Sequence, residues 1–228
     1  MSTDSESTRL PLFPLPNVVH FPATHLKLHV FEPRYRRLVH DLMELTPESR
    51  FIGMVLLKPG TYRSGPPEVF PGGTAGLLVD IESLPDGRSN ILLHGDFRFE
   101  IEREMESSPY RTALVRPVQE PLINEHDAGI LSVRHELIEV VETLAGELGE
   151  RFPIRPQVLL DEPESMEFEQ LVNSIAAEID LPILTKMSLL TETLPERALS
   201  LLQVLRNRCD LLEMLKPFRH LASDAELN

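Results

Sequence analysis

The spacing of apolar residues along the chain changes once, close to its middle, and this change limits the folds that the chain can adopt. Residues 9–118 hold short apolar segments interrupted by proline and glycine, whereas residues 125–220 hold long segments with apolar residues at helical spacing. Short segments bounded by turn residues are typical of strands, and the longer period is typical of amphipathic helices. Between them, Arg116–Pro121 contains two prolines, which disfavour both helix and sheet interior. The sequence therefore predicts an α+β protein with a strand-rich part followed by a helical part.

The first part is expected to hold several short strands and one helix. The proline-rich opening, Leu10–Pro16, is expected as an extended edge segment because proline cannot donate to a sheet. Asp86-Gly87 between two apolar runs predicts a hairpin, and Pro33 fits the first turn of a helix. The expected strands are His25–Val30, Phe51–Lys58, Thr74–Ser83, Ser89–His94, Phe97–Arg103 and Arg111–Val118. Strands at this spacing indicate a small barrel or sandwich.

The second part is expected to be a set of four amphipathic helices. Apolar stripes run from Ile130 to Leu148, from Phe168 to Ile179 and from Ala198 to Leu215, and a shorter helix is expected over Ile183–Glu192. Thr193-Leu194-Pro195-Glu196 is a capping-box start for the last of them. Four such helices need a partner surface for their apolar stripes, either one another or the strands.

Composition narrows the classes of function. The formal net charge is −14, and it is uneven: residues 1–120 carry a net charge of −3 and residues 121–228 carry −11. Since phosphate backbones need clustered cations, nucleic acid is not an expected partner. No apolar run is long enough to cross a membrane and Met1–Thr8 is polar, so a soluble, cytoplasmic protein is expected. The single cysteine, Cys209, permits no internal disulfide.

Residues that could carry chemistry give little sign of catalysis. His25 and His29 would share one face of a strand, but Lys27 between them would repel a metal ion, so a polar outer face is the preferred interpretation. No glycine-rich loop is followed by Gly-Lys-Ser/Thr, and no GxSxG elbow is present. Alternating Glu100, Glu102, Glu104 and Glu106 are interpreted as a solvated face. No cofactor, no metal and no catalytic residue are expected.

The remaining candidates would contact a polypeptide. Phe31, Tyr35 and Phe70 are the apolar anchors, with Phe70 expected in a proline-bracketed loop. Arg34 and Arg98 are the polar groups that would orient a bound chain, and Glu32 could act there or cap the helix after it. The competing interpretation for each aromatic is core packing, and exposure decides between the two.

Several segments resemble one family. Leu10–Pro22 followed by Leu28–Val39 closely resembles the opening of the N-terminal substrate-binding domains of Lon proteases. Further similar pieces follow in the family's order at Leu84–Arg88, Gly95–Phe99, Ser108–Tyr110, Lys186–Glu192 and Pro195–Arg197. His20 and Ala23–His25 are more polar than is usual in that family. The resemblance covers about residues 9–215.

The resemblance implies a fold and a role. It implies a PUA-like antiparallel β pseudo-barrel over residues 9–118 and a C-terminal helical bundle over residues 122–220, leaving tails at 1–8 and 221–228. It also implies a non-catalytic module that binds unfolded or extended polypeptide or a partner protein. Such a module could serve as an adaptor or recognition factor in protein quality control. The ATPase and the Ser-Lys peptidase of full-length Lon lie in other domains.

Two alternatives remain at this point. PUA-like barrels elsewhere bind RNA, and a basic patch around Arg34, Arg36 and Arg37 would be the footing for that function. The other alternative is an unrecognised hydrolase, for which no spacing of nucleophile and base gives support.

Overall fold

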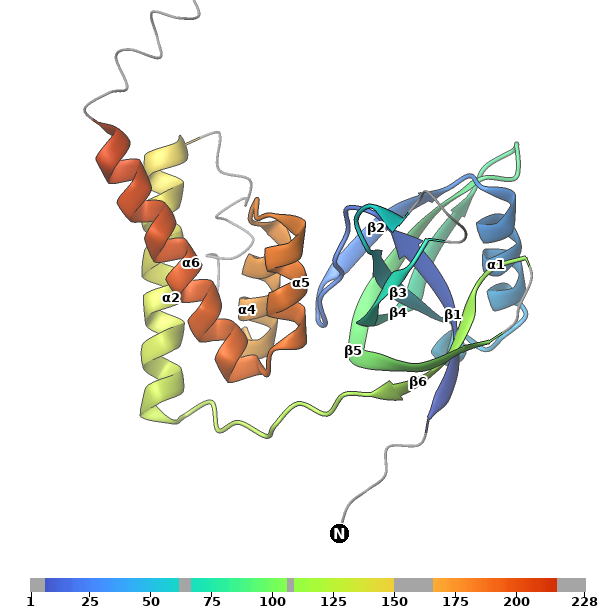
Figure 1. Cartoon of the computed structure of the whole chain (residues 1–228), viewed down its shortest axis with the longest axis horizontal. Helices are drawn as coiled ribbons and strands as arrows, with labels where there is room; N and C mark the ends of the chain where they lie inside the picture. The colour runs from blue at the N-terminus through green and yellow to red at the C-terminus, as the bar shows by residue number, and fades with distance from the viewer. Residues whose placement is uncertain (1–6, 62–66, 106–108, 150–165, 217–228) are drawn as a thin grey trace, which may run out of the picture. The chain divides into compact units, whose positions relative to one another are not determined.

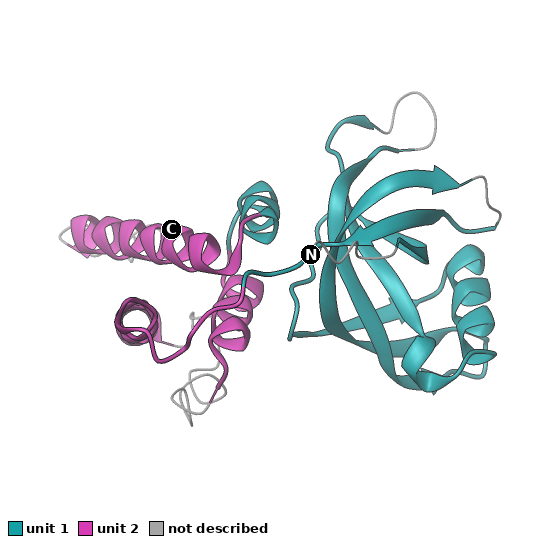
Figure 2. Cartoon of the chain, turned by 90° about the horizontal axis from the view of Figure 1, so that it is seen from below, with its two compact units in different colours: residues 1–121, 181–191 teal, residues 122–180, 192–228 magenta. Residues whose placement is uncertain are grey.

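The computed structural model describes residues 7–61, 67–105, 109–149 and 166–216, which fold into two compact units (Figure 2). The barrel unit comprises residues 1–121 and 181–191, and the helical unit comprises residues 122–180 and 192–228. Six strands and five α-helices lie in the described ranges, so the α+β prediction is confirmed. Of the expected tails, residues 1–6 and 221–228 lie outside the described residues, and Thr8 already belongs to the first strand.

The strands form a barrel with one additional strand at its side (Figure 1). The elements are β1 (Thr8–Leu15), β2 (His25–Val30), α1 (Pro33–Met43), β3 (Phe51–Leu57), β4 (Val69–Ser83), β5 (Ser89–Met105) and β6 (Thr112–Pro117). The order β5-β4-β3-β1-β6 closes because β6 also pairs with β5, and β2 is added to the other part of β5. The strand pairs are antiparallel, as the expected pseudo-barrel implies, except for one. The pair β1–β3 is parallel because the chain passes through β2 and α1 between them.

Strand β1 is not an edge, so that prediction was wrong. It pairs with β6 through Thr8–Pro11 and with β3 through Leu12–Leu15. The Leu12 amide donates to Arg111, on the β6 side, and backbone groups alternate sides along a strand. Pro11 therefore faces β3 just before that pairing begins, and Pro14 faces β6 just after that pairing ends. Both prolines occupy positions where a missing N–H costs no ladder hydrogen bond.

The two strands expected at Ser89–His94 and Phe97–Arg103 are one strand, β5. Opposite β4, Gly95 pairs with Gly76 and Phe97 pairs with Ala75, which leaves Asp96 as the extra residue of a bulge. Before the bulge β5 pairs with β2, and after it β5 pairs with β6. The bulge lets one continuous strand serve both neighbours.

Helix α1 closes one side of the apolar core. Pro33 stands in its first turn, as expected, and its buried face carries Tyr35, Leu38, Val39 and Leu42. These side chains pack with apolar residues of the strands, and the Tyr35 ring stacks on Phe13 with 3.9 Å between ring centroids. Burial raises the pKa of Tyr35.

The helical unit is built on two long helices, α2 (Ala128–Leu148) and α6 (Leu194–Leu215), with α4 (Phe168–Glu178) against α6. Ion pairs join Glu136 to Arg206 and Glu147 to Lys216, so α2 and α6 run in the same direction. The predicted capping box at Thr193 is confirmed. Arg197 was not expected in a core, yet it is fully buried and donates to the Asn173 side chain at 2.6 Å. Asp161 and Glu162, whose acidic side chains would suit the N-terminus of a following helix, lie outside the described residues.

Helix α5 (Ile183–Thr191) groups with the barrel unit rather than with the helices around it in sequence. This differs from the expected division at residue 122. Arg98 of β5 donates from Nη1 to the carbonyl of Leu190 at 2.7 Å, which ties the end of α5 to the barrel unit. Helical periodicity shows that a segment is helical, but it does not show which surface the helix packs on.

Two neighbouring glycines give a test of the barrel packing. A Cβ at Gly73 would lie 2.2 Å from the Met54 carbonyl oxygen, whereas a Cβ at Gly72 would meet only the Phe99 carbonyl at 3.4 Å. We expect Gly73→Ala to lower the free energy of unfolding by about 2–3 kcal/mol, because backbone must shift to admit the methyl group. Urea unfolding measures this effect, and Gly72→Ala is the matched control. Equal stabilities for the two variants would contradict the packing described.

Candidate functional site

Strand β2 has one unpaired side. It follows β5 at the end of the sheet order, and β5 is its only strand partner among the described residues. The six residues of β2 alternate between exposed and less exposed positions, with His25, Lys27 and His29 exposed. The predicted polar outer face at these three residues is therefore confirmed.

The hydrogen-bonding direction of β2 follows from its neighbours. The Gly95 amide donates to Thr24, so Gly95 faces β2, and by alternation Leu93, Ile91 and Ser89 face it too. Their partners in β2 are Leu26, Leu28 and Val30. The N–H and C=O groups of His25, Lys27 and His29 therefore point away from β5. An edge of this kind can pair with another extended chain.

An exposed aromatic ring ends this edge. Phe31 follows β2 directly, has 60% of its surface exposed and lies beside the His29 ring at 6.2 Å between centroids. An open hollow of about 510 Å³ adjoins the strand, lined by Lys27, Leu28, His29, Asp80, Glu82, Asn90, Ile91 and Leu92. The edge, Phe31 and this hollow are here called the β2 edge site.

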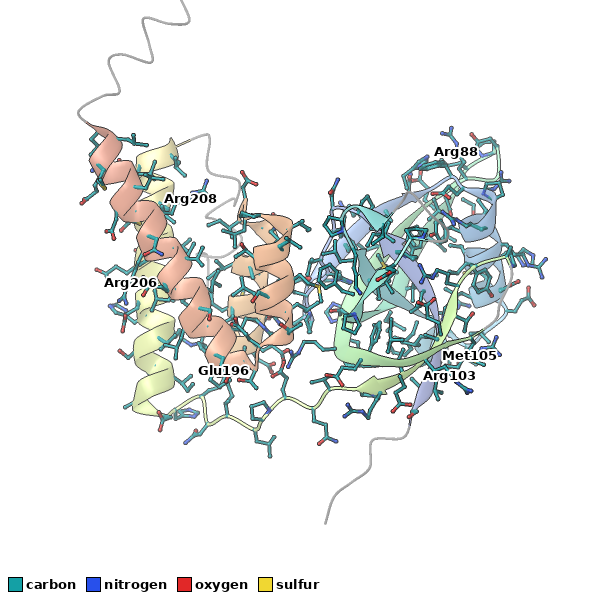
Figure 3. All side chains as sticks on the ribbon, in the orientation of Figure 1. Arg88, Arg103, Met105, Glu196, Arg206 and Arg208 are labelled. Carbon is teal, nitrogen blue, oxygen red and sulfur yellow. The ribbon has the colours of Figure 1, made fainter. Side chains whose placement is uncertain are left out.

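A chain of hydrogen bonds fixes the side chains of the β2 edge site. Arg88, at the tip of the β4–β5 hairpin (Figure 3), has Nη1 3.4 Å from His29 Nε2. Because arginine only donates, His29 Nε2 accepts, and Nδ1 carries the proton that it donates to Asn90 Oδ1 at 2.7 Å. Asn90 in turn donates to Glu82 at 2.7 Å. The imidazole plane next to Phe31 is therefore held in one orientation.

Three of the residues predicted for polypeptide contact lie together next to this edge. Phe31, Glu32 and Arg34 are consecutive or nearly so at the start of α1, and the Arg34 guanidinium pairs with the Glu32 carboxylate at 2.8 Å. Glu32 occupies the N-cap position of α1, but its side chain makes no capping hydrogen bond. Tyr35 is buried in the core, so its surface role was predicted wrongly and core packing accounts for it.

The proposed basic patch for RNA is largely neutralised. Arg34 pairs with Glu32, and Arg37 pairs with Asp41 at 2.8 Å. The outward carboxylates of β5 are paired in a similar way, Glu100 with Arg116 and Glu104 with Arg111. Glu106 of the expected acidic face lies outside the described residues.

Phe70 and Arg98 are not part of the β2 edge site. Phe70 is the second residue of β4, in a strand rather than the expected loop, and it is half-buried at the end of β4 away from the hairpin. Arg98 follows the bulge in β5, and only 5% of its surface is exposed. It could not orient a chain on the surface, because its guanidinium is committed to Leu190 and to Glu120 at 2.7 Å.

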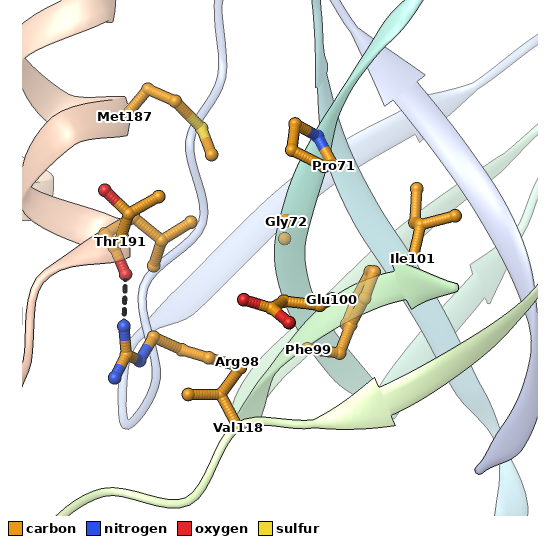
Figure 4. Close-up of a pocket in the computed structure, with 11 residues that line it drawn as sticks. Pro71, Gly72, Arg98, Phe99, Glu100, Ile101, Val118, Met187 and Thr191 are labelled. Atoms are coloured by element: carbon orange, nitrogen blue, oxygen red, sulfur yellow. Dashed lines mark hydrogen bonds between the residues drawn. The ribbon is translucent and has the colours of Figure 1, made fainter. Parts of the chain in front are cut away.

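Arg98 instead lines a small pocket within the barrel unit (Figure 4). The pocket has a volume of about 190 Å³ and is bounded by β4, β5, the segment after β6 and α5. Its walls are Pro71, Gly72, Gly73, Arg98, Phe99, Glu100, Ile101, Val118, Met187, Leu190 and Thr191. Sequence reasoning did not find this pocket, because α5 is distant in sequence and brought near only by the fold.

A buried histidine supports the segment that leads into β2. His20 Nε2 lies 3.2 Å from the Thr24 carbonyl and therefore donates to it, while Thr74 Oγ1 donates to the His20 carbonyl at 2.5 Å. The pKa of His20 is lowered from 6.5 to about 4, mainly by burial and to a smaller extent by the nearby His94 and His25. The sequence showed the polar character of His20 but not its burial. No group of three metal-ligating side chains is assembled within the described ranges.

Comparison with known proteins identifies the family. The family model of the ATP-dependent protease La (LON) substrate-binding domain matches residues 9–208. The chain belongs to this family. It is 24% identical to the Lon protease of Flavobacterium johnsoniae over 94% of this chain and 26% of that protein. For the Lon protease of Escherichia coli (strain K12) the identity is also 24%, over 95% of this chain and 27% of that protein. The chain thus spans about a quarter of the length of these Lon proteases.

Solved structures agree on the fold. The N-terminal domain of Mycobacterium avium complex Lon protease gives a TM-score of 0.63 at 14% identity, covering 89% of this chain and 98% of that one. The Lon N-terminal domain protein from Xanthomonas campestris gives 0.58 at 25% identity, covering 86% and 98%. The resemblance noted from the sequence is confirmed. In the described part of this Lon-family chain, no helix has the length and apolarity needed to cross a membrane.

The buried histidine predicts a pH dependence. Because the pKa of His20 is lower in the folded state, the unfolded chain binds the proton more readily, and its stabilising effect is complete only above pH 6.5. We expect the free energy of unfolding to fall by roughly 2–3 kcal/mol from this residue as the pH drops from 6.5 to 4.5. Urea unfolding across that range measures the loss. His20→Gln keeps a donor for Thr24 without titrating, so its pH dependence should be shallower, and an identical slope would contradict the assignment.

Proposed function

We propose that this Lon-family chain is a non-catalytic module that binds unfolded or extended polypeptide through the β2 edge site. The family model describes a substrate-binding domain, and the relatives that match are proteases. The observation that carries the proposal is the unpaired edge formed by His25, Lys27 and His29. A role as an adaptor or recognition factor in protein quality control follows from the same chemistry.

Main-chain pairing suits a module that must accept many sequences. An unfolded chain offers the same N–H and C=O groups whatever its side chains are, and an added strand satisfies both partners at once. A folded protein has already paired most of these groups within its own structure. The β2 edge would therefore bind unfolded chains in preference to folded ones, whatever the amino-acid sequence of the unfolded chain is.

Side chains at the β2 edge would contact a bound chain in addition to the main-chain hydrogen bonds. Phe31 gives an exposed apolar surface at the end of β2, and His29 beside it is held in place by Asn90 and Arg88. Lys27 places a cation in the middle of the edge, where it blunts pairing between copies of this chain. This favours an apolar or mildly acidic segment as the added strand.

Polypeptide is favoured over RNA as the partner. The net charge of −14 repels phosphate backbones, and two of the three arginines of the expected basic patch are paired with carboxylates. Binding to the β2 edge would be weakly sensitive to salt, whereas RNA binding would weaken steeply with it.

The main-chain mode can be tested at a single amide. The Lys27 N–H faces away from β5, so Lys27→Pro removes a donor from the free edge and leaves the β2–β5 ladder intact. We expect this variant to bind a fluorescently labelled, carboxymethylated polypeptide about tenfold more weakly, the effect of one lost hydrogen bond. Lys27→Ala, which keeps the N–H, should bind nearly as the natural chain does. Equal weakening by both changes would contradict strand addition.

The aromatic anchor has its own test. Phe31→Ala should weaken binding of the same polypeptide about three- to tenfold through lost apolar contact and leave the melting temperature unchanged, because the ring is exposed. Phe70→Ala is the comparison: the half-buried ring at the start of β4 should affect stability more than binding. A fall in melting temperature for Phe31→Ala with unchanged binding would refute the assignment.

A further inference from the structure

Two histidines from different strands lie side by side on the outer face of the sheet. His25 of β2 is the register partner of His94 of β5. Their imidazole rings have 4.9 Å between centroids and 52° between planes. The sequence suggests only His29 as a neighbour of His25, because no local pattern shows which residue lies across the sheet from it.

The backbone holds this histidine pair in a fixed position. The N–H and C=O groups of His25 point away from β5, so His25 and His94 form a non-hydrogen-bonded pair, the kind in which opposite side chains come closest. Next to the pair, the Gly95 amide donates to the Thr24 carbonyl and the Ala23 amide donates to the Gly95 carbonyl, each at 2.8 Å. The two imidazoles are therefore brought together before any ligand binds.

The separation of the two rings suits two ligands of one metal ion. With metal–nitrogen bonds of about 2.0–2.1 Å, a ring nitrogen about 1.1 Å from its centroid and bond angles of about 90–110°, two imidazoles on one ion have centroids roughly 4.5–5.2 Å apart. The observed 4.9 Å lies within this range. Imidazole nitrogen is a preferred ligand of Zn²⁺, Ni²⁺ and Cu²⁺.

Both rings offer a nitrogen to an ion from outside. His25 is exposed and His94 is half-buried. The buried nitrogen of His94 is Nδ1, so Nε2 is the nitrogen left for a ligand. Within the described ranges, neither ring makes a side-chain hydrogen bond that metal binding would break. His20 is not a third ligand, because only 3% of its surface is exposed and its Nε2 donates to Thr24.

Lys27 does not stand between these two ligands. It separates His25 from His29 along β2, whereas its own partner across the sheet is Leu92. Two residues along a strand span about 6.6 Å, and the exposed Lys27 side chain can extend into water away from the ion. Its charge lowers the affinity for a cation without excluding one.

We propose that His25 and His94 bind one divalent transition-metal ion of the Zn²⁺, Ni²⁺ and Cu²⁺ class through their imidazole nitrogens. Two protein ligands leave the other coordination positions to water. The bound ion links the first residue of β2 to β5, and thus fixes the strand that carries the free edge. The proposal is independent of polypeptide binding, because the two histidines bind the ion whether or not the edge takes a chain.

Calorimetric titration of Zn²⁺ into the full chain, prepared without a histidine tag, tests the proposal. We expect one site with a Kd of about 1–100 µM, as for half the ligands of a structural zinc site. His25→Ala should weaken binding at least tenfold and leave the melting temperature of the metal-free protein unchanged, because this side chain is exposed. His94→Ala should weaken binding as much. Zn²⁺ binding by folded His25→Ala at the natural affinity would overturn the proposal, whatever the behaviour of His94→Ala.

His40→Ala is the matched control. His40 is exposed and its Nδ1 lies 3.7 Å from the Asp41 carboxylate, so it is a competing place for a weakly held ion. This variant should bind Zn²⁺ as the natural chain does. An equal loss of affinity for His40→Ala and His25→Ala, or several equivalent sites, would mean an adventitious ion only and would overturn the proposal.

Two further measurements locate the ion. Zn²⁺ should shift the imidazole ¹⁵N signals of His25 and His94 but not those of His40. Zn²⁺ at about a hundred times its Kd should raise the melting temperature by about 5–10 °C, and His25→Ala should remove this rise. Shifts confined to other histidines, or a rise that His25→Ala retains, would contradict the site.

Discussion

Strand β5 is the element on which the barrel unit depends, because it pairs with three other strands among those described. It has 17 residues, and the bulge at Asp96 divides it into a part beside β2 and a part beside β6. Gly95 is required next to that bulge, since a Cβ there would lie 2.2 Å from the Phe21 carbonyl oxygen. The close approach of these two backbones sets where the barrel closes and where β2 is added.

Closing the barrel through β5 and β6 leaves β2 outside the ring. A closed barrel has no edges, so the one strand added beside it carries the free hydrogen-bonding groups of the sheet. Proteins usually protect such an edge with charge, and Lys27 gives partial protection here. This unpaired edge is the basis of the strand addition proposed for this member of the substrate-binding domain family.

Local sequence patterns predicted most helices and strands, but they did not predict which side chains are buried and which are exposed. The alternation in His25–Val30, the proline before α1 and the capping box at Thr193 were all confirmed, because each depends on residues within a few positions. The site was predicted less well. Phe31 is exposed as a contact residue must be, whereas Tyr35 stacks in the core and Arg98 is buried. Aromatic and arginine side chains serve cores and surfaces alike, so residue type alone did not separate these cases.

The sequence by itself determined most of the elements, the resemblance to the family and the uneven distribution of acidic residues, because these follow from periodicity, short motifs and composition. The tertiary structure decided which strand is the edge. The prolines of β1 suggested the wrong one, since a missing N–H is harmless wherever it faces no ladder partner, as at Pro11 and Pro14. The tertiary structure also decided that α5 belongs to the barrel unit and that Arg98 donates a hydrogen bond to Leu190, 92 residues away in sequence. Contacts between segments so distant depend on how every intervening element packs, and no local pattern encodes that packing.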